Sequence, residues 1–323
     1  MANPNLSEMI TTTARYRNQF ITDNVSESAA LLTRLKTKGK MKLVDGGREL
    51  VQELDYQANQ TAGYYSGYDT INVTPQDVLS AANYDWKQAC VTVSFSGLEA
   101  DVQNAGKEQY IDLVEARMEN AERSIMNLIS SGVYSDGTGS GGKQIGGLQL
   151  LIADTNSTGS PGNISRVNFT FWRNVSFDAT TDGGSAATSA NITQYMNRVW
   201  VQLVRGNDRP DLIVADNAYW RTYLESLQAI QRISRSDVAE AGYQTLQYMN
   251  ADVVLDGGYG GDAPANHMYF INTNYLKFVT AKQRNFTMLE DKSAYNQDAT
   301  VRTMVWAGNL IMSCAFLQGV LKD

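Results

Sequence analysis

Residues 107–154 read KEQYIDLVEARMENAERSIMNLISSGVYSDGTGSGGKQIGGLQLLIAD, and this stretch decides the fold. Its first half predicts a long helix from about residue 107 to 131, ending at Gly132, because glycine is common just past a helix C-terminus. At ~1.5 Å per residue such a helix is about 40 Å long. Apolar side chains recur at the three- and four-residue spacing of a single buried stripe, at Tyr110, Leu113, Val114, Met118, Ala121, Ile125, Leu128 and Ile129.

The glycine-rich segment after this helix nearly matches a phosphate-binding loop. The pattern needs Gly, four residues, Gly, Lys and then Ser or Thr. The chain supplies Gly137, Gly142 and Lys143, but Gln144 stands where a hydroxyl should coordinate Mg²⁺. Such a loop also follows a strand and opens a helix, whereas a helix precedes this one. A surface loop is therefore favoured, and a nucleotide-binding enzyme that uses Gly137–Lys143 is the alternative from another class.

The composition gives little support to catalysis or to tight nucleic-acid binding. With 323 residues, 43% hydrophobic and 19% charged, the chain is long enough for roughly two subdomains. Its net charge of −7 argues against a surface that grips phosphates. His267 is the single histidine, so we predict no catalytic residues, no cofactor and no metal site.

Localisation and thiol chemistry follow from equally simple features. The polar N-terminus lacks the apolar core of a signal peptide, and no apolar run approaches the ~18 residues of a membrane span. No membrane association is therefore expected. Cys90 and Cys314 lie in apolar or strand-like segments, and both are predicted to be buried thiols.

A long, mostly polar hairpin is expected after Gly46 and Gly47. Residues 50–56 alternate as in a half-buried strand, residues 63–68 form the tip, and residues 71–74 begin the return. An isolated hairpin is marginally stable in water, and the chain offers this one no obvious internal partner. Another subunit is therefore the expected support. The candidate inter-subunit contacts are Tyr64, Tyr65, Tyr68, Arg48, Glu49 and Glu53, with the tyrosines supplying large amphipathic contact area.

The rest of the chain predicts an α/β region followed by a β-rich one. Helical and short apolar segments alternate between residues 140 and 272, with helices at 191–205 and 217–231 and strands at 211–216, 251–255 and 268–272. Strand-like runs then follow at 276–279, 286–289 and 300–320. The last of these is expected to pair with a strand at 84–96 beneath the long helix.

The N-terminal segment is expected to be a polar arm. Within it, Thr33–Lys42 carries five basic residues and no acid. This run is either a solvated patch or a contact with an acidic neighbouring subunit or with nucleic acid.

This order of elements resembles the major capsid proteins of tailed bacteriophages that share the fold named after phage Hong Kong 97, and the resemblance covers essentially the whole chain. Its motifs are LISSGVYSDG (128–137), QIGGL (144–148), RPDLIVA (209–215) and WAGNLI (306–311). The resemblance implies a mixed α+β fold with four parts. These are an N-terminal arm (1–39), an extended E-loop hairpin (40–83), a peripheral domain with the long spine helix (84–139 and 273–323) and an α/β axial domain (140–272).

The same resemblance implies the function. Copies of the chain would assemble as pentamers and hexamers into an icosahedral shell around double-stranded phage DNA, without sequence-specific binding. Further partners would be a portal and possibly scaffold or decoration proteins, and the protein would reside in the virion after assembly in the host cytoplasm. An encapsulin-like shell around a protein cargo and a tail or other virion protein are alternatives. Some family members crosslink Lys to Asn between subunits, but no pair among Lys40, Lys42, Asn296 and Asn309 is placed in contact by the sequence, so no crosslink is predicted.

Overall fold

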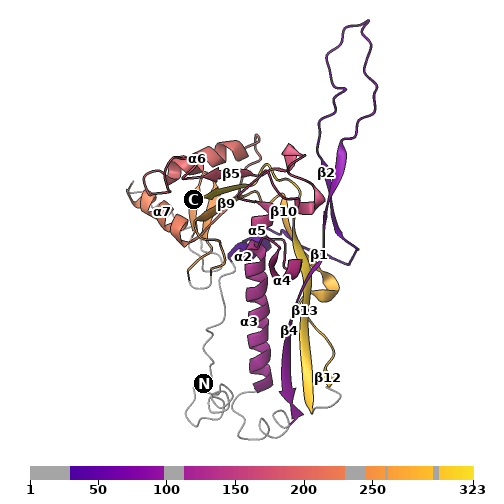
Figure 1. The fold of residues 1–323 in the computed structure, drawn as a ribbon, viewed down its shortest axis with the longest axis vertical. Coiled ribbons are helices and arrows are strands. Elements are labelled where there is room, and N and C mark those ends of the chain that lie inside the picture. The colour runs from indigo at the N-terminus through magenta and orange to yellow at the C-terminus, as the bar shows by residue number, and fades with distance from the viewer. Residues whose placement is uncertain (1–29, 98–112, 230–244, 259–260, 294–297) are drawn as a thin grey trace.

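The structure is a computed structural model that describes residues 30–97, 113–229, 245–258, 261–293 and 298–323. These residues form a lower layer, an upper layer and a hairpin that projects beyond both (Figure 1). Several predicted features lie outside the described residues, namely the start of the N-terminal arm, the first turns of the spine helix, the last two residues of the helix predicted at 217–231, and Asn296.

The lower layer is a six-stranded sheet built around one long strand, β13 (Ala299–Met312). Strand β4 (Lys87–Ser96) lies antiparallel to β13 from Ser96 opposite Ala299 to Lys87 opposite Gly308, and the helix α3 packs along β4. The predicted pairing of these two segments beneath the helix is therefore confirmed. The other strands are β1 (Met41–Val44), β10 (Leu276–Ala281), β11 (Thr287–Met288) and β12 (Lys292–Ser293).

The long helix α3 is described from Leu113 to Tyr134, and it does not end at Gly132 as predicted. Glycine occupies position 132 for a different reason. A Cβ atom there would lie 3.1 Å from the Cδ1 atom of Ile145, so the absence of a side chain lets the following loop pack closely against the helix. The described 22 residues span about 33 Å. The stripe of Ala121, Ile125 and Ile129 is buried as predicted, whereas Leu128 is half exposed.

The upper layer is a second six-stranded sheet in the order β5 (Val175–Asp178), β14 (Gly319–Lys322), β9 (His267–Ile271), β6 (Leu212–Ala215), β8 (Ala251–Leu255) and β7 (Thr245–Tyr248). Helices α6 (Ile192–Leu203) and α7 (Asn217–Ala229) pack on one face of this sheet. The other face joins the core that contains α3. The predicted helices and strands of the α/β region are therefore present.

One predicted strand is wrong. The apolar run at 300–320 is not continuous, because β13 ends at Met312 and the chain turns before β14. Strand β14 then pairs with β5 and β9 of the upper sheet instead of continuing the lower one. The chain crosses from one sheet to the other here, and Met312 before the turn and Val320 after it are buried in the same core between the layers. An apolar pattern alone does not reveal such a crossing.

Short helical segments and a buried arginine shape the loop between α3 and β5. Helices α4 (Gly139–Gly142), α5 (Leu148–Leu151), η2 (Pro161–Asn163) and η3 (Thr170–Trp172) lie in this region, and η5 (Lys282–Arg284) follows β10. The guanidinium of Arg166 is almost fully buried and donates to the carbonyls of Leu150, Leu151 and Trp172. These bonds hold the loop in one shape, and the loop supports the base of the hairpin.

Candidate assembly surfaces

The hairpin has a buried base. Strands β2 (Leu50–Asp55) and β3 (Leu79–Tyr84) pair antiparallel, and Leu50 and Leu54 from the first strand pack into the main core. The Tyr84 hydroxyl donates to the Met312 carbonyl at 2.8 Å, which joins the hairpin to the end of β13. The prediction that the chain offers the hairpin no internal partner is therefore wrong for the base. Part of its support is distant in sequence, since Met312 lies 228 positions from Tyr84.

The outer part of the hairpin, unlike its base, has no regular secondary structure. Residues 56–78 contain no strand, so the return strand predicted at 71–74 is wrong, and the pairing resumes at Leu79. Asx turns organise this segment locally, with the Asn59 and Asn72 side chains accepting from the amides of Thr61 and Thr74. Figure 1 shows the segment extending well away from both layers.

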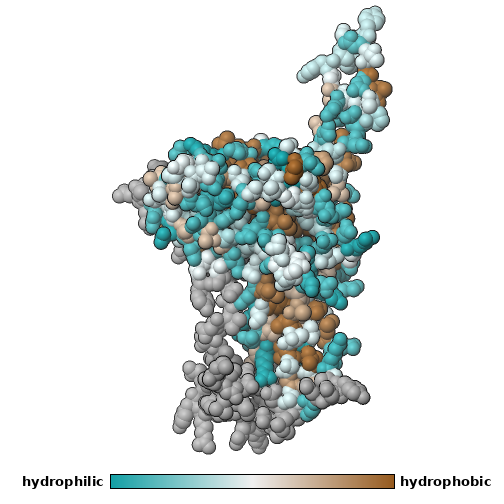
Figure 2. Space-filling view, viewed as in Figure 1, coloured by the Kyte–Doolittle hydropathy of each residue, from teal (hydrophilic) through white to brown (hydrophobic). Residues whose placement is uncertain are grey.

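The six predicted contact residues fall into two groups along the hairpin. Tyr64, Tyr65 and Tyr68 are at its outer end, where the relative exposures are 111%, 70% and 105%. Arg48, Glu49 and Glu53 are at its base. There the Arg48 and Glu49 side chains form an ion pair of 3.8 Å, and Glu53 points outward from β2. Figure 2 shows polar side chains over much of the projection, with apolar ones along its middle and base. Their contacts with other subunits stay a prediction.

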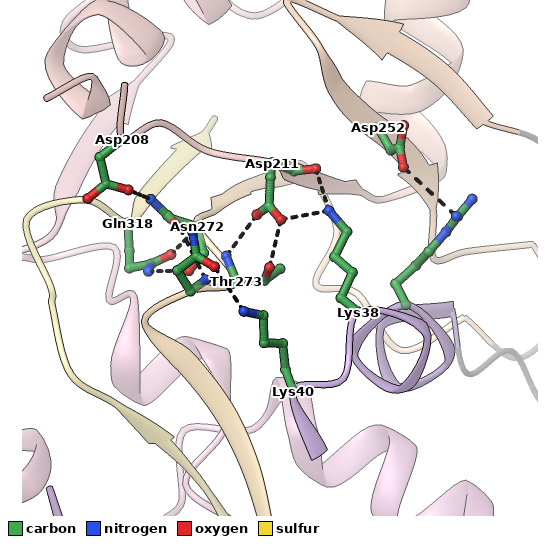
Figure 3. Close-up of polar contacts among 10 residues, drawn as sticks. Lys38, Lys40, Asp208, Asp211, Asp252, Asn272, Thr273 and Gln318 are labelled. Atoms are coloured by element: carbon green, nitrogen blue, oxygen red, sulfur yellow. Dashed lines mark hydrogen bonds and ion pairs between the residues drawn. The ribbon is translucent and has the colours of Figure 1, made fainter. Parts of the chain in front are cut away.

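The basic run near the N-terminus is anchored within the chain. Helix α2 (Ala30–Thr37) buries Leu31 and Leu35 in the main core, and Arg34 lies 3.9 Å from Asp252 of β8. The Lys38 ammonium donates to the Asp211 carboxylate at 2.7 Å and to its carbonyl at 3.0 Å (Figure 3). For these two basic residues, the expectation of a solvated patch or an intermolecular contact is therefore wrong.

Asp211 was missed by sequence reasoning, and it organises the junction between the layers. Its carboxylate also accepts from the Thr273 amide at 2.8 Å and hydroxyl at 2.6 Å. Beside it, the Asn272 side chain donates to Asp208 at 2.7 Å, and the amide of Gln318 donates to the Asn272 carbonyl at 3.0 Å (Figure 3). The only sequence signal was an acid directly before an apolar strand, which is common at strand ends.

The glycine-rich loop does not have the setting of a nucleotide site. It follows helix α3, and its own helix α4 is a single short turn with left-handed φ angles at Ser140 and Gly141. The Lys87 side chain donates to the Gly142 carbonyl at 2.7 Å, and the buried Asn309 side chain accepts from the Gly146 amide at 3.1 Å. The loop therefore serves as a packed connection between α3 and the lower sheet.

The single histidine and the two cysteines are the remaining residues with reactive side chains that the sequence singled out. His267 lies between the Ala265 carbonyl, 2.7 Å from its Nδ1 atom, and the Asp154 carboxylate, 3.0 Å from its Nε2 atom. Cys314 is buried as predicted, and burial raises the pKa of its thiol to about 11. Cys90 is exposed, which contradicts its predicted burial. It faces away from α3 because its neighbours Ala89 and Val91 occupy the inward positions of β4. In the part of the chain that the structure describes, none of the helices has the length and apolar character needed to cross a membrane.

Comparison with solved structures shows the fold. The chain is similar to the capsid protein of cyanophage A-1(L), with a TM-score of 0.71 at 17% identity over 96% of each chain. It is similar to the capsid of an empty gene transfer agent (GTA) particle, with a TM-score of 0.65 at 12% identity over 96% of this chain and 95% of that one. An encapsulin complex from Synechococcus elongatus gives a lower TM-score of 0.53 at 9% identity, over 94% of this chain and 91% of that one. The fold is therefore the mixed α+β Hong Kong 97-like capsid fold.

Sequence comparison identifies the family. No curated protein sequence matches the chain. The sequence profile of the family described as SU10 major capsid protein matches residues 91–308, which is about two thirds of the chain and includes α3, the glycine-rich loop, most of the upper layer and most of β13. The chain therefore belongs to the SU10 major capsid protein family, whose members build the icosahedral shell of a phage virion and are not enzymes.

Proposed function

We propose that the projecting hairpin is the element by which each subunit holds its neighbours in the shell. The observation that carries this proposal is the division of the hairpin into a buried base and a largely exposed outer segment. Residues 56–78 form no strand and carry five large exposed apolar side chains, namely Tyr64, Tyr65, Tyr68, Ile71 and Val73. Such exposed side chains do not stabilise a monomer. Tyrosines in particular are typical anchors of interfaces.

The six predicted contact residues have two different roles in this proposal. Tyr64, Tyr65 and Tyr68 reach the neighbour and bury their rings, since aromatic side chains dominate interface energetics. Arg48, Glu49 and Glu53 meet it near the base, where charge sets orientation more than affinity. The division into N-terminal arm, E-loop hairpin, peripheral domain and axial domain is part of the proposal, with β14 contributing to the axial sheet.

Pentamers and hexamers follow from repeated contacts of one kind. A hairpin that binds a different surface on the next copy makes a head-to-tail interface, and such interfaces close into rings when the rotation permits. Each contact can be weak because closure multiplies the number of contacts. Double-stranded DNA would fill the shell without sequence-specific binding, in keeping with the net charge of −7, and a portal and scaffold or decoration proteins would complete the particle.

The encapsulin-like alternative and the nucleotide-binding alternative have less support. The solved phage and gene transfer agent capsids give higher TM-scores than the encapsulin, and the profile that matches is of a phage capsid protein. The Gly137–Lys143 loop has the setting of a structural connection, because it follows α3 and its Gly142 carbonyl accepts a hydrogen bond from Lys87 of β4.

Shortening the hairpin tests the proposal. The Tyr56 amide donates to the Val78 carbonyl at 3.1 Å, so residues 57–77 can be replaced by an Asn-Gly turn that leaves the β2–β3 register intact. This deletion spares Leu50 and Leu54, which a longer deletion from Gly46 would remove from the core. We expect a folded subunit that forms no shells in electron micrographs and elutes as a small species.

A matched control keeps the hairpin at full length. In it, Tyr64, Tyr65 and Tyr68 are each replaced by Phe, which preserves aromatic area and should preserve assembly. Shells at normal yield from the shortened chain would refute the proposal.

A further inference from the structure

Strand β1 is an open edge of the lower sheet. Among the described strands it pairs with β10 alone, so its other side has no partner strand in the structure. Its Met41 and Leu43 side chains are 41% and 59% exposed, which is unusual for apolar residues in a strand beside a core. Exposed edges with apolar side chains are surfaces on which another chain docks.

The same edge is strongly basic. Met41 lies opposite Phe278 in the parallel pairing, so the alternation of side chains places Lys40, Lys42 and Lys277 on one face of the two strands. Residues 36–45 and 276–284 together contain a single acid, Asp45, against Lys36, Lys38, Lys40, Lys42, Lys277, Lys282 and Arg284. Lys38 is engaged by Asp211, and the other six basic residues are exposed or half exposed. Three of these six have partners within the chain: Lys40 donates to Asn274, Lys282 pairs with Asp45 and Arg284 donates to Gln88.

The hairpin has the opposite charge. Residues 46–85 contain one basic residue, Arg48, against Glu49, Glu53, Asp55, Asp69, Asp77 and Asp85. Glu53 and Asp55 lie on the exposed face of β2 together with Val51, whose exposure is 59%. This face therefore combines acidic and apolar side chains, while the β1 edge presents its lysines on one face and Met41 and Leu43 on the other.

We infer that the acidic hairpin of one copy docks on the basic β1–β10 edge of a neighbouring copy. The inference rests on the proposed function and names the receiving surface. Docking within one copy is ruled out by the chain path, because the hairpin follows β1 directly and points away from it (Figure 1). Charge complementarity of this kind fixes orientation and register.

Charge reversal in both surfaces tests the inference. Lys42→Glu with Lys277→Glu reverses the edge, and Glu53→Lys with Asp55→Lys reverses the hairpin. Each double variant of the full-length chain should lower shell yield about tenfold, since like charges placed together at an interface cost at least the ~1.4 kcal/mol that corresponds to a factor of ten. The quadruple variant restores opposite charges and should return the yield to within about twofold of the original chain.

Three measurements keep the outcome decisive. Lys292→Glu, at the far end of the sheet on β12, is the matched control and should assemble normally. Lys42→Gln with Lys277→Gln removes the positive charge without adding repulsion, and should give an intermediate yield. This variant replaces the charge-reversed one if the reversed variant folds poorly. Assembly of the original chain should also weaken as salt rises.

The results separate this inference from the proposed function. Normal yields from both reversals, or a folded quadruple variant that still fails to assemble, would overturn the docking surface named here. Salt-independent assembly of the original chain would overturn it as well. The proposed function is tested separately by the shortened hairpin. If shortening the hairpin blocks assembly and the quadruple variant does not recover the shell yield, the hairpin binds a neighbour at another surface.

Discussion

Replacing Tyr84 by phenylalanine should loosen the base of the hairpin. The Tyr84 side chain is 5% exposed, its hydroxyl donates to the Met312 carbonyl at 2.8 Å, and the Met312 amide lies 3.3 Å from the same oxygen. Burial raises the pKa of Tyr84 well above its usual value, as expected where water is largely excluded. Tyr84→Phe keeps the ring and its packing but removes the only atom that makes these bonds.

The expected magnitude follows from the groups left behind. A buried carbonyl that loses its donor costs about 1–3 kcal/mol, and no water can easily replace the hydroxyl at a site this well packed. For a chain of this size each kcal/mol lowers Tm by roughly 2 °C, so the fall should be about 2–6 °C. Thermal unfolding of the unassembled subunit, followed by circular dichroism, measures it. Tyr68→Phe is the matched control and should leave Tm unchanged, because that side chain is fully exposed.

Hydrogen exchange locates the effect. Amides of β2 and β3 should exchange faster in Tyr84→Phe, whereas those of β4 and the central part of β13 should not. Equal Tm values for Tyr84→Phe and Tyr68→Phe, together with unchanged exchange in β2 and β3, would show that the Met312 contact does not hold the hairpin.

Three further substitutions test the cores, the anchor and the single histidine. Gly147→Ala places a Cβ atom 2.5 Å from the backbone nitrogen of Ser135, so we expect a loss of roughly 3 kcal/mol in denaturant unfolding, against no loss for the open position Gly63→Ala. Lys38→Ala should cost about 1 kcal/mol because its ion pair is partly exposed, and Lys36→Ala almost nothing. Burial lowers the pKa of His267, but hydrogen bonds with Asp154 and the Ala265 carbonyl outweigh it and raise the pKa overall. The histidine therefore adds stability that is fully present below about pH 6.5 and is lost as pH rises through the raised pKa, and His267→Gln should flatten this part of the stability–pH curve.

Local patterns predicted most of the regular elements. The three- and four-residue spacing of α3 and α6 reflects one buried face of each helix. The continuous apolar runs of β6, β8 and β9 reflect strands that are buried on both faces of the sheet. The predictions failed where one sequence pattern is compatible with two different local structures. Gly132 could end a helix or permit a close approach, and only the position of Ile145 distinguishes the two.

The candidate site was less predictable because its support is distant in sequence. The hairpin base depends on Met312, and the anchor of α2 depends on Asp211 and Asp252. Each of these residues is ordinary in its local context. The exposed outer segment, by contrast, was predicted from composition, since turn-forming and polar residues dominate it and leave too few apolar side chains to form a core.

The position of β1 between two anchored points bears on how the shell assembles. On one side the Lys38–Asp211 pair and the buried face of α2 fix the chain, and on the other Leu50 and Tyr84 fix the hairpin base. The strand is therefore held in place before any neighbour arrives, and a preorganised surface loses little conformational entropy on binding. The outer hairpin has only local turns and must lose entropy when it docks. A rigid receiving edge paired with an adaptable hairpin makes each contact weak and tolerant of angle, which is what one subunit needs to occupy both five- and six-fold rings.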